Sequence, residues 1–312
     1  MKITLLDAAT LGKLSDLQLI HQFGDVQVYD STSPGQRLER IGDSEIVVTN
    51  KVQLDRRILT AARQLRLICI TATGLNNVDL DAAAELGIEV RNAAGYSTFS
   101  VAQHTFSMLF QLIHNIGYYD DFVKSGQYAQ SAMFTHYGPP IRELHGKNFG
   151  IIGLGTIGQQ VARIATAFGA RVSYYSSSGR NQNPDYPRCS LMKLLADNDV
   201  VSIHAPLTDR TENLIGAPEL DAMKKEAILI NVGRGGIVDE AALADALHSG
   251  ALGGACLDVY ATEPIRADNP LLHPDIASKL VLCPHVAWTS QEARDQLFSI
   301  TLRNIRDYLE GK

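Results

Sequence analysis

The stretch FGIIGLGTIG at residues 149–158 decides the fold of this chain. Its apolar start, residues 149–152, predicts a buried strand, and residues 156–168 follow the spacing of an amphipathic helix. Between them the pattern G-x-G-x-x-G is formed by Gly153, Gly155 and Gly158. In this context the glycines allow a tight turn, let a pyrophosphate approach the backbone and let the helix pack closely on the strand. The stretch therefore predicts a dinucleotide site at the N-terminus of the helix.

A second strand is predicted at residues 170–175, and the acid that usually follows such a strand is absent. An Asp or Glu there binds the ribose 2′-hydroxyl, whereas this chain continues with SSSGR at 176–180. Serine does not repel a 2′-phosphate, and arginine pairs with one. We therefore expect Ser176, Ser177 and Arg180 to contact the cofactor, with NADP favoured over NAD. The alternative, in which Ser176 only replaces the acid and Arg180 points to solvent, stays open.

Composition indicates a globular protein of two domains. The chain has 312 residues, of which 45% are hydrophobic and 20% charged, values typical of globular proteins. A formal net charge of −6 gives no electrostatic footprint for nucleic acid or for an anionic membrane. No apolar stretch reaches the roughly 20 residues that span a bilayer. The four scattered cysteines predict reduced thiols and a cytoplasmic protein; they are Cys69, Cys189, Cys256 and Cys283.

Strand-like runs alternate with helical stretches on both sides of the glycine pattern. This alternation predicts an α/β fold with two doubly wound parallel sheets. We expect a flavodoxin-like substrate (catalytic) domain in residues 1–100 plus 285–312, and an inserted Rossmann dinucleotide-binding domain in residues 101–284. A long helix is expected at 101–116, followed by a less regular region. A last amphipathic helix, about 289–309, is expected to return to the first domain, so that two crossings join two lobes with a cleft between them.

Polar residues follow three late strands of the second domain, where ligands of open α/β sheets bind. They are Arg234, Asp258 with Glu263 a few residues on, and His285. A guanidinium holds a substrate carboxylate, and a histidine is the natural general acid near neutral pH. A neighbouring carboxylate stabilises its imidazolium form. Singly, each residue also fits a structural role: a surface ion pair, a cap or a core histidine. Together they suit the reduction of a 2-keto acid, with Asp258 orienting the nicotinamide.

Other chemistries lack their motifs. His104, His114 and His204 have no comparable context of polar residues, and on that ground we interpret them as structural or incidental. We predict no metal site because no H-E-x-x-H or C-x-x-C pattern is present. A G-x-S-x-G elbow is also absent.

The chain resembles the D-2-hydroxyacid dehydrogenases. Matching segments occur in family order over most of its length: ATGLNNVDLDAA (72–83), NAAGYSTFSVAQHT (92–105), ELHGKNFGIIGLGTIG (143–158), HAPL (204–207), NVGRGGIVDE (231–240), GACLDVYATEP (254–264) and PHVAW (284–288). The resemblance implies His285 as proton donor, Glu263 as its partner and Arg234 as substrate clamp. It also implies a small 2-keto or 2-hydroxy acid as ligand, bound by Arg234, His285 and the amides of Thr73 and Gly74, and a homodimer.

The resemblance extends to the cofactor contacts. The expected cofactor-binding residues are Gly153, Gly155, Thr156, Ile157, Gly158, Ser176, Ser177, Arg180, His204, Ala205, Pro206, Val232, Gly233 and Asp258. Within the family, PHVAW and ATGLNNVD are most similar to glycerate dehydrogenases, which reduce hydroxypyruvate or glyoxylate. Dehydrogenases of D-lactate or branched 2-hydroxy acids remain alternatives, and a non-enzymatic dinucleotide sensor is a distant one. Candidate walls of the side-chain pocket are Leu75, Tyr96, Phe134, Tyr137 and Trp288.

Overall fold

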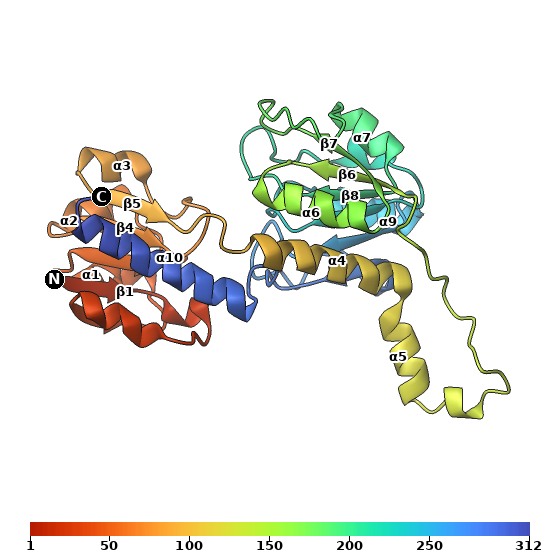
Figure 1. The fold of residues 1–312 in the computed structure, drawn as a ribbon, viewed down its shortest axis with the longest axis horizontal. Helices are drawn as coiled ribbons and strands as arrows, with labels where there is room; N and C mark the ends of the chain where they lie inside the picture. Colours follow the sequence, from red (N-terminus) through yellow and green to blue (C-terminus); the bar gives the residue numbers. More distant parts are fainter. The chain divides into compact units, whose positions relative to one another are not determined.

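The computed structural model describes residues 1–312, which form two compact units (Figure 1). Unit 1 comprises residues 1–97 and 289–312, and unit 2 comprises residues 98–288. The domain boundaries expected from the sequence, 100/101 and 284/285, differ from the boundaries of these units by a few residues. The first moves because helix α4 (Thr98–His114) packs on α6 (Thr156–Ala167) within unit 2. The second moves because the amides that follow His285 donate to Asp258 of the same unit.

Unit 1 is built on a five-stranded parallel sheet in the order β2-β1-β3-β4-β5. This is the flavodoxin-like order that the sequence predicted. Its central strands are apolar at nearly every position, and both faces are covered, so β3 and β4 are buried throughout. The strands are β1 (Lys2–Leu5), β2 (Asp25–Val28), β3 (Ile46–Thr49), β4 (Leu67–Ile70) and β5 (Glu89–Asn92).

Helices cover this sheet, and the C-terminal helix returns to it as expected. Helix α10 (Gln291–Leu309) lies along β4, and Arg91 of β5 donates to the carbonyl of Asn304 in that helix (Figure 1). The other helices begin at acidic or polar caps, of which Asp55 and Asp79 accept from amides of the first turn. They are α1 (Arg37–Ile41), α2 (Arg56–Ala61) and α3 (Leu80–Glu85), with 3-10 turns η1 (Ala8–Leu11), η2 (Leu17–Phe23) and η3 (Pro34–Gln36).

Unit 2 contains a six-stranded parallel sheet in the order β11-β10-β9-β8-β6-β7. A parallel bridge between Tyr174 of β7 and Arg188 lies beyond β7. With that bridge as a minimal third strand, the sheet follows the dinucleotide-binding order 3-2-1-4-5-6, which confirms the predicted fold class. The strands are β6 (Asn148–Ile152), β7 (Arg171–Tyr175), β8 (Val200–Ile203), β9 (Ile228–Asn231), β10 (Gly254–Leu257) and β11 (Leu280–Leu282).

Each face of this sheet has its own apolar core. Helices α4 and α6 cover one face, where Phe106 stacks on Phe149 with ring centroids 5.9 Å apart. The second core, which includes Leu195, Leu220 and Leu243, lies under the helices of the opposite face. Those helices are α7 (Leu191–Asp197), α8 (Ala217–Asp221) and α9 (Glu240–Ser249), followed by 3-10 turns η5 (Pro270–Leu272) and η6 (Pro274–Lys279).

The region after α4 is more ordered than the sequence suggested. Asn115 adopts a left-handed conformation with φ of 51° and ends α4, and a second helix, α5 (Ile116–Lys124), begins there. Turn η4 (Tyr128–Gln130) follows. Helix α5 has no buried residue, and with the segment that follows it projects from the rest of unit 2 (Figure 1). We call residues 116–142 the arm.

Two observations bear on the predictions from composition. No helix combines the length and the apolarity that a membrane crossing requires. All four cysteines are free thiols, and Cys69 and Cys256 are buried.

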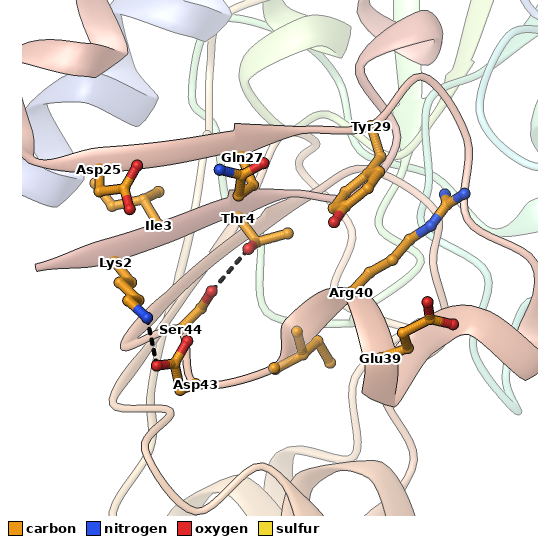
Figure 2. Close-up of a pocket in the computed structure, with 12 residues that line it drawn as sticks. Lys2, Ile3, Thr4, Asp25, Gln27, Tyr29, Glu39, Arg40, Asp43 and Ser44 are labelled. Atoms are coloured by element: carbon orange, nitrogen blue, oxygen red, sulfur yellow. Dashed lines mark hydrogen bonds and ion pairs between the residues drawn. The ribbon is translucent and has the colours of Figure 1, made fainter.

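A small polar pocket of about 190 Å³ lies between β1, β2 and residues 39–44 of unit 1 (Figure 2). Its polar groups bond to one another: Lys2 pairs with Asp43, and the hydroxyls of Thr4 and Ser44 are 2.7 Å apart. None of the predicted site residues lines it.

Candidate active site

The glycine turn after β6 has the shape that the sequence predicted. Gly153 has a φ of +91°, and a Cβ there would lie 2.9 Å from the amide nitrogen of Ala205. A Cβ on Gly158 would overlap the carbonyl oxygen of Gly153, so only glycine lets α6 approach the strand. By contrast, the space beside Gly155 is open to at least 4 Å. That opening, at the N-terminus of α6, fits a pyrophosphate against the backbone.

Three strand-end turns meet at this edge of the sheet. A Cβ on Gly233, after β9, would lie 2.9 Å from the carbonyl oxygen of Ala205, which itself follows β8. Ala205 in turn contacts Gly153. The structure therefore brings together the predicted cofactor residues of the first, fourth and fifth strands of the dinucleotide order. Of the remaining ones, Val232 is buried and Pro206 is exposed.

His204 is a neutral imidazole in this setting. Its Nε2 lies 2.9 Å from the hydroxyl of Ser202, and its Nδ1 is buried without a hydrogen-bond partner. Burial lowers the pKa of His204 to about 3. An unsatisfied buried nitrogen beside the glycine turn is the kind of polar atom that a bound ligand can satisfy.

The turn after β7 is tightly folded around Ser176. Only 3% of Ser176 is exposed, and its hydroxyl oxygen accepts from the amide of Asn181 at 3.2 Å. The hydroxyl hydrogen remains available to donate. Ser177 is half-buried, and Arg180 is exposed.

Arg234 lies in a turn that a neighbouring asparagine braces. The Asn231 side chain donates to the carbonyl of Arg234 at 2.9 Å and accepts from the amide of Gly233 at 3.0 Å. The Arg234 guanidinium donates to the carbonyl of Gly233 at 2.8 Å and is half-buried. A Cβ on Gly235 would overlap the carbonyl of Tyr260. The loop that carries Arg234 is therefore pressed against the loop that carries Glu263.

Asp258 fixes the segment that contains His285. Its carboxylate accepts from the amides of Val286 and Ala287, each at 2.8 Å, and its carbonyl accepts from the amide of His285 at 2.8 Å. The side chain is 1% exposed, and this burial raises the pKa of Asp258, while the two amide donors act in the opposite direction.

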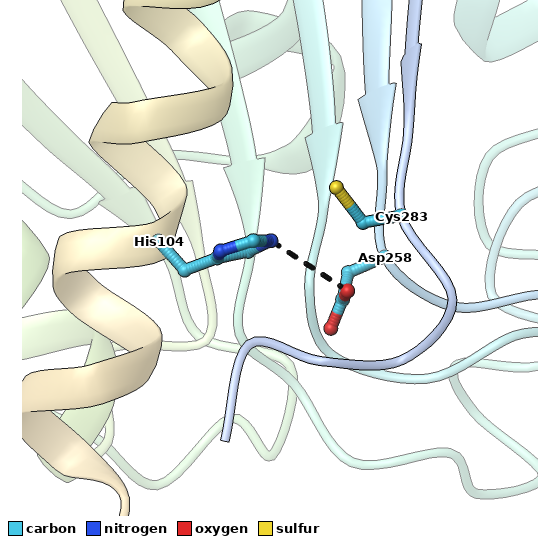
Figure 3. A group of neighbouring side chains, drawn as sticks. All are labelled: His104, Asp258 and Cys283. Atoms are coloured by element: carbon cyan, nitrogen blue, oxygen red, sulfur yellow. Dashed lines mark ion pairs between the residues drawn. The ribbon is translucent and has the colours of Figure 1, made fainter. Parts of the chain in front are cut away.

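His104 of α4 faces the same carboxylate, with Nε2 3.6 Å from Oδ1 of Asp258 (Figure 3). A ring nitrogen of His104, a carboxylate oxygen of Asp258 and the Sγ of Cys283 all lie within 4.8 Å of one another. Both oxygens of Asp258 already accept from backbone amides, so we interpret the cluster as a backbone anchor.

His285 and Glu263 form a direct pair. Nδ1 of His285 lies 2.7 Å from Oε2 of Glu263, and the other oxygen of Glu263 accepts from the amide of Tyr260 at 3.1 Å. His285 has a φ of +56°, a conformation that non-glycine residues rarely adopt and that clusters at functional sites. This backbone strain and the carboxylate partner together set the direction of the ring, which is 24% exposed.

Thr73 and Gly74 follow β4 in unit 1. The carbonyl of Thr73 accepts from the side chain of Asn92 at 2.6 Å. The amides of Thr73 and Gly74 make no hydrogen bond within the structure. Two neighbouring unused amides are suitable donors for a carboxylate. Among the candidate pocket walls, Phe134 and Tyr137 lie on the arm, 91% and 85% exposed.

Sequence reasoning missed two residues that shape the site. Asn231 ends a strand directly before Gly233, and that position was a usable signal, because Asn side chains often bond the backbone two residues on. His104 was interpreted only as structural or incidental. Its approach to Asp258 depends on how α4 packs beside β10 and β11 (Figure 3), which no local pattern reveals.

Comparison with known proteins identifies the family. The model of the D-isomer specific 2-hydroxyacid dehydrogenase NAD binding domain matches residues 106–287. The chain is 37% identical to the hydroxypyruvate reductase of Blautia hydrogenotrophica over 100% of this chain and 98% of that protein. It is 36% identical to the glycerate dehydrogenase of Methylorubrum extorquens over 100% and 97%.

The fold also matches that of a solved structure. An acyclic imino acid reductase, Bsp5, in complex with NADPH and D-Arg superposes with a TM-score of 0.89 at 28% identity, covering 100% of this chain and 98% of that chain. The chain therefore belongs to the D-isomer specific 2-hydroxyacid dehydrogenase family and is an oxidoreductase that uses a nicotinamide dinucleotide.

Proposed function

We propose that this protein reduces a small 2-keto acid to the D-2-hydroxy acid with NADPH, and that hydroxypyruvate or glyoxylate is the substrate. The observation that carries the proposal is the pair of His285 and Glu263, whose side chains are 2.7 Å apart. The pair belongs to the same six-stranded unit as the glycine turn after β6. The substrate choice rests on relatives named hydroxypyruvate reductase and glycerate dehydrogenase, which align over their full length.

In this mechanism His285 supplies the proton. The bound nicotinamide supplies the hydride. Reduction builds negative charge on the keto oxygen, and His285 donates a proton to that oxygen from Nε2, since Nδ1 is held by Glu263. The carboxylate of Glu263 holds Nδ1 and fixes the ring orientation. Asp258 keeps the strained His285 backbone in place through the three hydrogen bonds described above.

In the proposed complex the substrate carboxylate is held by one guanidinium and two backbone amides. We assign this role to the guanidinium of Arg234, which the Asn231 brace holds at the strand end, together with the free amides of Thr73 and Gly74. A planar guanidinium binds a carboxylate through two parallel hydrogen bonds. The glycines on both sides of Arg234 let its loop pack directly against the backbone of Ala205 and Tyr260.

The proposed NADPH preference rests on the turn after β7. No acid follows the strand, the hydroxyl of Ser176 can still donate, and Arg180 is exposed in the same turn. A carboxylate at this position would repel the 2′-phosphate, whereas the arginine attracts it.

One experiment tests substrate and cofactor together. Turnover is followed by absorbance with hydroxypyruvate, glyoxylate, pyruvate and 2-ketoisocaproate, each with NADPH and with NADH. We expect the highest kcat/KM with hydroxypyruvate or glyoxylate and NADPH. A higher kcat/KM with pyruvate or 2-ketoisocaproate contradicts the substrate assignment, and a preference for NADH contradicts the cofactor assignment. Cofactor binding without any turnover favours a dinucleotide sensor.

We also propose a homodimer in which the arm packs on a second copy. Large apolar side chains of the arm are exposed in this chain, an arrangement typical of interaction surfaces. They include Ile116, Val123, Met133, Phe134, Tyr137 and Ile141. Light scattering of the purified protein tests this, with twice the chain mass expected. We expect Phe134→Asp to shift the mass towards the monomer, and a monomeric wild type contradicts the proposal.

A further inference from the structure

A second arginine reaches the turn after β7 from a different part of the sequence. Arg210 lies in the loop after β8, and its Nη1 donates to the carbonyl of Ser178 at 3.0 Å. A Cβ on Gly179 would lie 3.8 Å from its Nη2. The guanidinium therefore lies against the segment 176–180, although more than thirty residues separate the two in sequence.

The segment that Arg210 contacts is fixed relative to the glycine turn. The amide of Asn181 donates to the hydroxyl of Ser176, and the Asn181 side chain donates to the carbonyl of Leu154, which lies between Gly153 and Gly155. Asn181 thus joins the glycine turn after β6 to the turn after β7, where we expect the adenosine ribose. A group held against residues 176–180 is consequently held at a defined place relative to the dinucleotide.

The same turn gathers positive charge that is not neutralised locally. Arg188 donates to the carbonyl of Asn181 at 3.3 Å, Arg210 donates to the carbonyl of Ser178, and Arg180 lies within the turn itself. The bonds of Arg188 and Arg210 go to main-chain carbonyls and leave their charges uncompensated. The acids adjacent in sequence, Asp185 and Asp209, are both exposed.

We propose that Arg210 is a specificity-determining residue that binds the adenosine 2′-phosphate of NADPH at the turn after β7. This inference rests on the NADPH preference proposed above. A guanidinium has five N–H donors, so the bond to Ser178 leaves most of them for phosphate oxygens. That bond also orders the side chain in advance, which reduces the entropy lost on binding.

Binding of two adenosine fragments isolates the contribution of the phosphate. Isothermal titration measures the Kd of adenosine 2′,5′-bisphosphate and of AMP for the wild type and for Arg210→Ala. We expect Arg210→Ala to raise the Kd of the bisphosphate about tenfold, the loss typical of one charge-assisted contact, and to change the Kd of AMP less than about twofold. Arg210→Lys retains a positive charge, and we expect its Kd for the bisphosphate to lie between those of the wild type and Arg210→Ala.

Arg171→Ala is the matched control. Arg171 is exposed at the opposite end of β7, where its Nε donates to the side chain of Asn148 at 2.9 Å. This substitution removes an arginine charge from the same strand, and we expect the affinity for both fragments to be unchanged.

The outcomes separate this inference from the proposed cofactor preference. If the wild type binds AMP as tightly as the bisphosphate, both fail. If the wild type prefers the bisphosphate but Arg210→Ala keeps the same ratio, only the role of Arg210 is overturned and the NADPH preference stands. An equal loss for both fragments makes Arg210 a brace of the turn and also overturns the inference.

Discussion

The amide of His285 donates to the carbonyl of Asp258 at 2.8 Å, and the Asp258 carboxylate binds the next two amides. A buried acid therefore holds the segment in which His285 adopts a positive φ. The same acid was expected only to orient the nicotinamide. Its position supports a second role, in which it positions the proton donor.

Replacing Asp258 by asparagine tests this role. Asparagine offers one oxygen in place of two, and its NH₂ group would face an amide donor. We expect a free energy of unfolding lower by about 1–3 kcal/mol, the cost of an unsatisfied buried donor. We also expect a kcat lower by about ten- to a hundredfold because the His285 ring is displaced.

Asp245→Asn is the control for that variant, since Asp245 is an exposed acid of α9. Denaturant unfolding and steady-state kinetics give both quantities. A variant Asp258→Asn with wild-type kcat and a raised cofactor KM alone would show that Asp258 contacts the cofactor without positioning His285.

His204 predicts a specific dependence of stability on pH. Burial lowers the pKa of His204 from 6.5 to about 3, so between these values the unfolded chain binds a proton that the folded chain does not. The stability contributed by the neutral ring is complete above about pH 6.5 and is lost as the pH falls towards 3. Between pH 7 and pH 5 the loss amounts to about 2 kcal/mol.

We expect His204→Gln to lose about 2 kcal/mol less than the wild type over that range, measured by urea unfolding at both pH values. His21→Gln, at an exposed position of unit 1, serves as control. Equal losses in the wild type and in His204→Gln would show that the ring is protonated in the folded protein.

Gly155→Ala separates folding from cofactor binding. Gly155 has a φ of −78° and open space beside it, so alanine fits the backbone and the free energy of unfolding should change by less than about 0.5 kcal/mol. The added methyl group occupies the place of the pyrophosphate, and we expect the cofactor Kd to rise about tenfold or more. Gly35→Ala, also in open space, should change neither. Unaltered cofactor affinity in Gly155→Ala would place the pyrophosphate elsewhere.

The two sheets were predictable because their strands are short apolar runs that end in glycine or polar residues. The apolar run 149–152 and the glycines after it predicted β6 and α6, and the apolar run 170–175 predicted β7. Asp258, Glu263 and His285 were proposed as site residues because the carboxyl ends of parallel strands share one edge.

The missed features depend on contacts between distant segments. Arg210 lies in a loop whose sequence shows only that it is polar. Its contact with Ser178 arises because two loops that follow different strands lie against each other. The minimal strand at Arg188 consists of a single bridge to Tyr174 and has no periodicity to detect. Likewise, the unit boundary after Trp288 follows from the Asp258 hydrogen bonds, which composition does not encode.

The most direct test of the account is His285→Gln. Glutamine keeps a polar side chain of comparable length but has no titratable proton donor. Stopped-flow or steady-state assays with NADPH and hydroxypyruvate should show kcat reduced by about 10²- to 10⁴-fold, while the Kd of NADPH, measured by fluorescence titration, changes less than about twofold. Turnover at the wild-type rate would contradict the assignment of His285 as proton donor.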